Sequence, residues 1–355
     1  MDPTAGSVHF NVACYIYPLK AASMLYGSAT FILLALAYTI SYNFFNAPLD
    51  DTSLASDLAS VRQAFDVEFL LSEKELFTTG YVESYYSETT DNALLELLMG
   101  TGMHTRLDGM QQAGYVMHEI ATVQAQTVLE VGSGKGHCSL YLARVLHGVQ
   151  FTGLDLLQRH IQVATAAIGD RRNITFVRGD AGDLSDEPYD IIFGVESLCH
   201  MDTAGKLQGF VRQAAAKLNA GGRLIIIDGF RSATFQWASA DQQLAMQLAE
   251  AGFRIRKMPS RADWIAAGED SGLVLVSDYD LTDEALPFWT LGWRISRAVF
   301  RVPYFVRWLA SVRPQTAANL LAAAMTAHAL RDSAEYGVLV FEKSSNREAS
   351  QEQRG

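Results

Sequence analysis

Residues 129–136 read Leu-Glu-Val-Gly-Ser-Gly-Lys-Gly, a glycine-rich loop that directly follows a short apolar stretch. A strand that runs into such a loop and then into a helix lets a ligand approach the backbone at the helix N-terminus. The glycine spacing is GxGxG, and His137 stands where a nicotinamide-type fingerprint would need its third glycine. The loop therefore predicts a Rossmann-like ligand site that departs from the nicotinamide pattern.

The sequence around this loop alternates short apolar strands with helices. We expect five strands over residues 127–131, 150–154, 174–177, 190–193 and 223–228, and two later strands over 273–277 and 336–341. Asp202 or Thr203 is placed to cap the helix before the fifth strand. Short buried strands separated by helices predict an α/β fold with a doubly wound, Rossmann-like sheet of seven mostly parallel strands.

Two acidic residues follow the second and third expected strands. Asp155 ends the second strand, nineteen positions past Gly136 (155 − 136), where a carboxylate can accept hydrogen bonds from both hydroxyls of a ribose. Asp180 and Ala181 follow the third strand. An acid at that place can meet the amino group of an adenine.

These features together resemble the class I methyltransferases, whose methyl donor is S-adenosylmethionine. The resemblance implies that Glu130 contacts the methionine end of this cofactor, that Asp155 holds its ribose and that Asp180 with Ala181 holds its adenine. The implied glycine contacts are Gly132, Gly134 and Gly136. The alternative is a glycine turn in some other Rossmann-like protein.

The residues after the fourth strand indicate which group of methyltransferases the chain resembles. Residues 193–201 read Phe-Gly-Val-Glu-Ser-Leu-Cys-His-Met, with no (D/N)PPY motif of the enzymes that methylate amino groups of DNA bases. The segment resembles the tocopherol methyltransferase group, and prenyl and sterol C-methyltransferases carry a glutamate where Glu196 stands. Three further stretches resemble that group, namely Tyr85-Tyr86, Gly102-Met103-His104 and residues 285–289, Ala-Leu-Pro-Phe-Trp. The resemblance covers roughly residues 81–343. It is incomplete after His104, because the group has a second histidine there and this sequence has Thr105.

Glu196 and His200 are the candidate catalytic residues. Glu196 lies at the carboxyl end of a central strand, where open α/β sheets bind ligands. A carboxylate there can remove a proton from the substrate as the methyl group arrives, or orient a substrate hydroxyl. His200, one helical turn later, is a candidate base or hydrogen-bond donor. The alternatives are that Glu196 binds only the ammonium group of the cofactor and that His200 is a packing or capping residue.

Five residues are expected to cover the cofactor or line the substrate pocket. Tyr85, Tyr86 and His104 are placed to close over the cofactor, and Phe288 and Trp289 to line an apolar pocket. For all five the competing interpretation is ordinary core packing.

Composition excludes several classes of partner. The formal net charge is −11, and an acidic chain is poorly suited to nucleic acid, whose phosphates need a basic surface. The three cysteines are far apart, and no zinc-type spacing occurs. We therefore expect neither a disulfide framework nor a metal site. We expect the chain to work in a reducing compartment. Oligomeric state leaves no signal in the sequence.

Two segments point to a membrane. Residues 21–49 carry no charge, and a helix of that length could cross a bilayer core. We expect this run to anchor the chain on the cytoplasmic side, where the cofactor is made; a helical hairpin or a buried segment is the alternative. Residues 286–313 hold five arginines, several aromatic residues and no acid. That composition is typical of an interfacial segment or of a substrate cap with a solvated basic face.

The expected organisation has four parts. Residues 1–60 form the apolar N-terminal segment, 61–120 a helical cover, 121–343 the methyltransferase domain with a substrate cap at about 281–330, and 344–355 a disordered tail. The expected function is S-adenosylmethionine-dependent methylation of a lipophilic small molecule of the quinol, terpenoid, sterol or alkaloid type, as in secondary metabolism. The alternatives are a fatty-acyl C-methyltransferase or cyclopropane-forming relative, and a non-catalytic protein that keeps the cofactor pocket.

Overall fold

The computed structural model describes residues 48–77, 80, 83, 86, 110–184 and 186–344, and among them seven strands form one sheet. The order across the sheet is β3-β2-β1-β4-β5-β7-β6. β7 is antiparallel to both of its neighbours, whereas the pairs among β1–β5 are parallel. The strands are β1 (Thr127–Val131), β2 (Gln150–Asp155), β3 (Ile174–Arg178), β4 (Tyr189–Val195), β5 (Leu218–Arg231), β6 (Leu273–Asp280) and β7 (Ala334–Lys343). The predicted seven-stranded, mostly parallel sheet is confirmed.

The strand order reverses between β1 and β4. From β1 the chain moves outward to β2 and β3, and then returns to place β4 on the other side of β1. In open α/β sheets, ligands bind outside the carboxyl ends of the strands at such a reversal of strand order. The glycine loop follows β1 and Glu196 follows β4, so the topology brings both predicted sites to this edge of the sheet.

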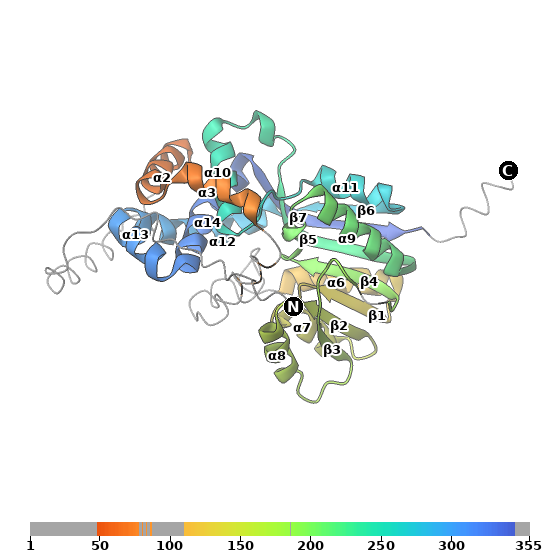
Figure 1. The fold of residues 1–355 in the computed structure, drawn as a ribbon. Coiled ribbons are helices and arrows are strands. Elements are labelled where there is room, and N and C mark those ends of the chain that lie inside the picture. The colour runs from red at the N-terminus through yellow and green to blue at the C-terminus, as the bar shows by residue number, and fades with distance from the viewer. Residues whose placement is uncertain are drawn as a thin grey trace, which may run out of the picture.

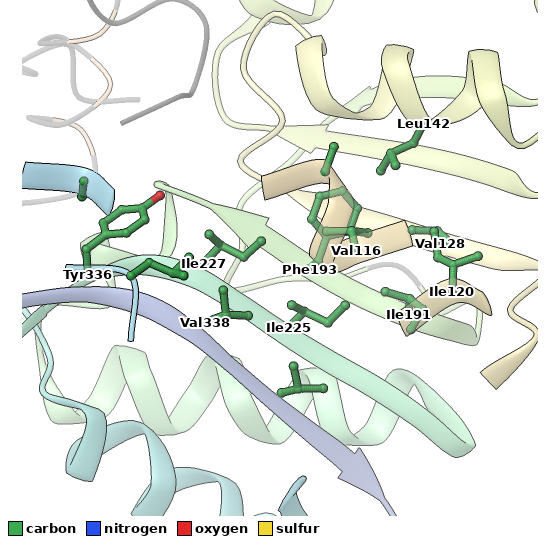
Figure 2. Packing of buried hydrophobic residues seen from close by; sticks show 14 of the residues in the cluster. Val116, Ile120, Val128, Leu142, Ile191, Phe193, Ile225, Ile227, Tyr336 and Val338 are labelled. Carbon is green, nitrogen blue, oxygen red and sulfur yellow. The ribbon is translucent and has the colours of Figure 1, made fainter. Parts of the chain in front are cut away.

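Helices cover both faces of the sheet because the strand side chains alternate. Ile225 and Ile227 of β5 point to one face, and Leu224 and Ile226 belong to the cluster on the other. The first face packs against α6 (Met110–Val123), α7 (His137–Val145) and α8 (Gln158–Ala166), and the second against α9 (Ala204–Lys217) and α11 (Arg261–Asp270). Figure 2 shows the first face, where Tyr336 ends the row of packed side chains.

A separate group of helices lies at the edge of the sheet where the parallel strands finish (Figure 1). It contains α2 (Asp51–Ala64), α3 (Val67–Glu73), α10 (Ala240–Gly252), α12 (Thr282–Phe300), α13 (Pro303–Val312) and α14 (Pro314–Asp332). The chain passes through α12, α13 and α14 between the end of β6 and the start of β7, so these helices begin and end at that edge. They share a hydrophobic cluster with α2 and α10.

Several expectations about the two ends of the chain fall outside the described residues. The uncharged run over 21–49 is described only at its last two residues, and the tail only at residue 344. Within the described part of the chain, no helix combines the length and apolarity that a bilayer crossing needs. The segment expected as the cap, residues 281–330, consists of three helices, and its action as a substrate cover stays a prediction.

A buried carboxylate connects α2 to the other helices of this group. Asp57 accepts hydrogen bonds from Trp293 Nε1 at 2.7 Å and from His328 Nε2 at 3.0 Å. Its second oxygen lies 3.1 Å from Nε of Arg297. Trp293 and His328 are fully buried and Asp57 is nearly so. Because a buried carboxylate needs such partners, this contact fixes α2 against α12 and α14.

We expect Asp57→Ala to lower the free energy of unfolding by about 3–5 kcal/mol, because it leaves Arg297 without its counter-charge and two buried donors without an acceptor. Urea unfolding followed by circular dichroism measures this loss. Asp51→Ala is the control: the Asp51 carboxylate pairs with Arg331 but is 84% exposed, so its removal should cost under about 1 kcal/mol. Equal losses in the two variants would contradict a structural role for the buried contact.

Candidate active site

The glycine loop is held against the end of β2 by backbone hydrogen bonds. The amides of Gly132 and Ser133 both donate to the Leu154 carbonyl, at 2.8 and 2.9 Å. The amide of Gly134 donates to Oδ2 of Asp155 at 2.8 Å. The predicted cofactor acid therefore also shapes the loop.

The glycines of the loop are required for different reasons. A Cβ added to Gly132 would lie 2.3 Å from the Ser197 Cβ, so the loop after β4 leaves no room for a side chain there. A Cβ on Gly136 would overlap the Phe176 ring. At Gly134 the same Cβ would meet nothing within 4 Å, so Gly134 is the position at which the loop faces open space. All three have φ in the left-handed region, which disfavours other residues.

Glu130 is buried beside the N-terminus of α7. Its Oε2 accepts hydrogen bonds from the amide of Ser139 at 3.1 Å and from the Ser139 hydroxyl. Burial raises the pKa of Glu130 to about 8, against the effect of these two donors. The carboxyl is therefore largely protonated at neutral pH, and a nearby cation would favour its ionised form.

Asp155 and Asp180 occupy different environments. The second oxygen of Asp155 accepts from the Leu157 amide at 2.9 Å and lies 3.1 Å from Nδ1 of His160, and the residue is buried. Asp180 is exposed in the turn after β3, where it accepts from the Gly182 amide at 2.8 Å, and Ala181 is half-buried.

Glu196 occupies a strained backbone position at the end of β4. Its φ is 51°, in the left-handed region that residues with a side chain rarely adopt. Its Oε1 accepts two hydrogen bonds, from the Tyr336 hydroxyl at 2.7 Å and from Gln112 Nε2 at 3.0 Å. Gln112 Nε2 also donates to the Tyr336 hydroxyl at 2.7 Å. Three elements, α6, β4 and β7, thus meet at one carboxylate oxygen.

Burial and the charge of Glu196 raise the pKa of Tyr336 well above its usual value. The phenol therefore stays protonated and acts as a hydrogen-bond donor. Asp228, near the end of β5, is also buried and accepts from the amides of Cys199 and Gly229, at 2.9 and 2.8 Å. The pKa of Asp228 is raised to about 7, mainly by desolvation and to a smaller extent by the charge of Glu196.

His200 contacts the segment expected to cover the cofactor. Its Nε2 lies 2.9 Å from the Tyr86 hydroxyl, and the two rings meet edge to face. Burial lowers the pKa of His200 to about 4, so the ring is neutral at pH 7 and is a weak base. The contact with Tyr86 fits a hydrogen-bonding role, and the catalytic role predicted for His200 stays a prediction. The other two predicted cover residues, Tyr85 and His104, lie outside the described residues.

Phe288 and Trp289 pack within α12. Trp289 is 9% exposed and makes edge-to-face contacts with Phe288 and Phe253. It belongs to the same hydrophobic cluster as Tyr336. Core packing, the alternative given for Trp289, accounts for these contacts, and its role in lining a substrate pocket stays a prediction.

Three residues near Glu196 were not predicted from the sequence. Asp228 was open to the argument that identified Glu196, because it also lies near the carboxyl end of a central strand. Gln112 and Tyr336 carried no such signal, since they reach the site from a helix and from the antiparallel strand. Among the described residues no cluster of histidine, cysteine or acidic side chains could hold a metal ion.

Comparison with known proteins identifies the family. The family described as Methyltransferase domain matches residues 128–222. An S-adenosyl-L-methionine-dependent Diels-Alderase, iccD, of Talaromyces variabilis is 30% identical over 207 residues, which are 55% of this chain and 68% of that protein. The chain belongs to the class I S-adenosylmethionine-dependent methyltransferases.

Other members of the family match over shorter or more distant stretches. A fatty-acid O-methyltransferase of Mycolicibacterium smegmatis is 36% identical over 113 residues, 30% of this chain and 39% of that protein. In structure, the cyclopropane synthase MmaA2 from Mycobacterium tuberculosis superposes with a TM-score of 0.59 at 13% identity, covering 76% of this chain and 99% of that chain. At that identity the likeness shows the fold alone.

The cofactor of the class I methyltransferases is S-adenosylmethionine, and the described residues suit it. Gly134 leaves open space at the loop, and Glu130 is a buried acid that a cation would ionise. We assign the methionine end to Glu130 and the glycine loop, the ribose to Asp155, and the adenine to Asp180 and Ala181. These residue assignments remain predictions.

We expect Gly134→Val to weaken S-adenosylmethionine binding by about tenfold or more, because its side chain would occupy the space beside the loop. Isothermal titration calorimetry measures the affinity. Gly272→Val is the matched control, since Gly272 also has a left-handed φ, of 76°, and open space at its Cβ. Affinity reduced equally by both variants, or by neither, would contradict this placement of the cofactor.

The buried acids predict a loss of stability with rising pH. The pKa of Glu130 is raised from 4.5 to about 8 and that of Asp228 from 3.8 to about 7, so the folded chain holds protons that the unfolded chain releases. Their stabilisation is complete below the unfolded pKa values and is lost as pH rises towards 8. His200, with its lowered pKa, opposes this trend only below about pH 6.5.

Between pH 6.5 and 8 the cofactor-free chain should therefore lose stability, with Glu130 contributing roughly 1–2 kcal/mol. Chemical unfolding at several pH values measures the slope. Glu130→Gln should flatten it, whereas Glu269→Gln, at an exposed position of α11, should not. An unchanged slope in the Glu130 variant would show that Glu130 is already ionised in the fold.

Proposed function

We propose that this enzyme transfers the methyl group of S-adenosylmethionine to a lipophilic small molecule. The observation that carries the proposal is the Glu196 carboxylate, held by Tyr336 and Gln112 next to Ser197, which packs against Gly132 of the glycine loop. The fatty-acid O-methyltransferase among the relatives supports a lipophilic substrate. A quinol, terpenoid, sterol or alkaloid from secondary metabolism fits this class.

When bound, S-adenosylmethionine would supply an electrophilic methyl group, and breaking its methyl–sulfur bond would give S-adenosylhomocysteine as the leaving group. The substrate forms one new bond to the methyl carbon and loses one proton. Glu196 takes that proton on its carboxylate, which is the role of a general base. The buried phenol of Tyr336 and the amide of Gln112 hold Glu196 in its strained conformation, so both are positioning residues.

The substrate has to be identified before this role can be measured. Metabolite comparison with and without the gene, using an isotopically labelled methyl donor, finds the molecule that gains the label. We then expect Glu196→Gln to lower kcat about 10²- to 10⁴-fold, because the variant keeps the shape and loses the proton acceptor. Cofactor affinity should change little, and Tyr336→Phe should lower kcat less.

Glu269→Gln is the control for this substitution and should keep the kcat of the unmodified enzyme. Near-normal turnover of Glu196→Gln would reduce Glu196 to a structural role. Loss of cofactor affinity in that variant would instead show that Glu196 binds the ammonium group of the cofactor.

A second candidate function is a cyclisation that uses the cofactor without methyl transfer. The relative with 68% of its length covered is named a Diels-Alderase, which favours this possibility. A cycloaddition joins two pairs of carbons with no leaving group and no proton to remove, so the product has the mass of the substrate. A methylated product is heavier by one CH₂ group and carries the label, so the same assay separates the two functions.

We also propose that residues 1 to about 50 attach the enzyme to a membrane, with the catalytic domain on the cytoplasmic side. The support is the uncharged run over residues 21–49, which is long enough to span a bilayer. Recovery of the full-length chain in the soluble fraction without detergent would contradict this attachment.

A further inference from the structure

The arginine- and aromatic-rich stretch over residues 286–313 divides into an inward and an outward part. On α12, Trp293 is fully buried and Trp289 nearly so. On α13, Tyr304, Trp308 and Val312 are exposed to 68%, 50% and 49%. These three lie four residues apart, so they form one stripe along the exposed face of the helix. A stripe of large apolar side chains left in water marks an interaction site.

We propose that this stripe of α13 docks the enzyme on an anionic membrane surface. The proposal goes beyond the reaction and does not depend on which chemistry the site performs. Tyrosine and tryptophan are the aromatic residues that favour the boundary between lipid tails and water, because each combines an apolar ring with a polar group. An amphipathic helix with cationic flanks is the structure that binds in this way.

The charges around the stripe match an anionic surface. Arg301 before α13 and Arg313 after it are both exposed. No aspartate or glutamate occurs from residue 285 to residue 331, although the whole chain has a net charge of −11. Of the acids in the chain beside α13, Asp57 is buried and Asp51 pairs with Arg331. The exposed Asp66 lines one cavity with Arg307 on the inner side of the helix. Anionic lipid headgroups therefore meet a locally basic face on an acidic protein.

The inner side of α13 is occupied by its neighbours. Arg301, just before α13, donates to the Ser56 hydroxyl at 3.0 Å, and Arg307 donates to the Gln63 carbonyl, so α13 lies along α2. Val306 and Ala310 of α13 are buried. The stripe therefore lies on the face of α13 that is turned away from these contacts.

The stripe is also preorganised by its neighbours. The rings of Phe305 and Trp308 stack with their centroids 5.6 Å apart. The guanidinium of Arg307 lies 5.5 Å from the centre of the Tyr304 ring. These contacts hold the rings in place before any membrane arrives, which lowers the entropy lost on docking.

The test measures binding to vesicles of phosphatidylcholine with and without phosphatidylserine, for the full-length chain and for a chain that starts at residue 48, in which binding cannot come from the uncharged run. Tyr304→Ser with Trp308→Ser should weaken binding to the anionic vesicles about tenfold or more, because the apolar contact is lost. Arg301→Gln with Arg313→Gln should weaken it by up to about 25-fold at low salt, at about fivefold for each charge. Trp237→Ser is the control, since Trp237 is 75% exposed on η4 (Phe235–Trp237).

A second measurement reports which face meets the lipid. Brominated lipids in the anionic vesicles quench tryptophans that reach the interface. Quenching should fall in Trp308→Phe and persist in Trp237→Phe. Vesicle binding that is absent, indifferent to phosphatidylserine or unaffected by the stripe variants would overturn the proposal. So would a dimer that dissociates in the stripe double variant, because the stripe would then bind a second copy of the chain.

Discussion

The loops after β1 and β4 approach so closely that only glycine fits at position 132. A Cβ there would lie 2.3 Å from the Ser197 Cβ, and the Ser197 hydroxyl donates to the Val131 carbonyl at 2.7 Å. This contact joins the glycine loop to the residue directly after Glu196. The left-handed backbone of Glu196 is thus held from both sides, by the loop contact and by its side-chain partners. Cofactor loop and candidate base are positioned by one constraint.

The site is built at a cost in stability. Glu130 and Asp228 are carboxyls buried so deeply that both hold protons near neutral pH, and desolvation is the main cause in each case. A fold optimised only for stability would not bury them. Carboxyls with raised pKa values near the carboxyl ends of two parallel strands, here β1 and β5 on either side of β4, are typical of sites where ligands or protons bind. The helices at the same edge supply compensating contacts, such as those of Asp57.

The sequence was sufficient for the sheet because its signals are local. All seven strands overlap the apolar runs that predicted them, although β5 begins at Leu218 and not at residue 223, and the GxGxG loop lies directly after β1. The glycine spacing did not reveal that Gly132 packs against Ser197, a residue far away in the chain. It also did not reveal that Gly134 faces open space. The same limit applies to Tyr336, which lies 140 positions from its partner Glu196. No local pattern records such a contact.

Composition also cannot tell which aromatic residues of a stretch are buried and which are exposed. Trp289 and Trp308 occur in one arginine-rich stretch, and composition alone gives both the same interpretation. The structure separates them because α12 packs on β7 and α14, whereas α13 packs on α2 and α14 and leaves its outer face open. Burial depends on which helices meet, and that is decided by contacts far apart in the chain.

The edge of the sheet where the helices gather also links the membrane face to the site. α13 leads directly into α14, which ends at Asp332, four residues before Tyr336. Tyr336 in turn donates to Glu196. The helical group is therefore joined to the Glu196 carboxylate by a single helix and one short connection. α14 is packed against α10, α12 and α13, so the packing of this group also fixes where β7 begins. The helices that carry the proposed membrane face thus help to position the tyrosine that holds the candidate base.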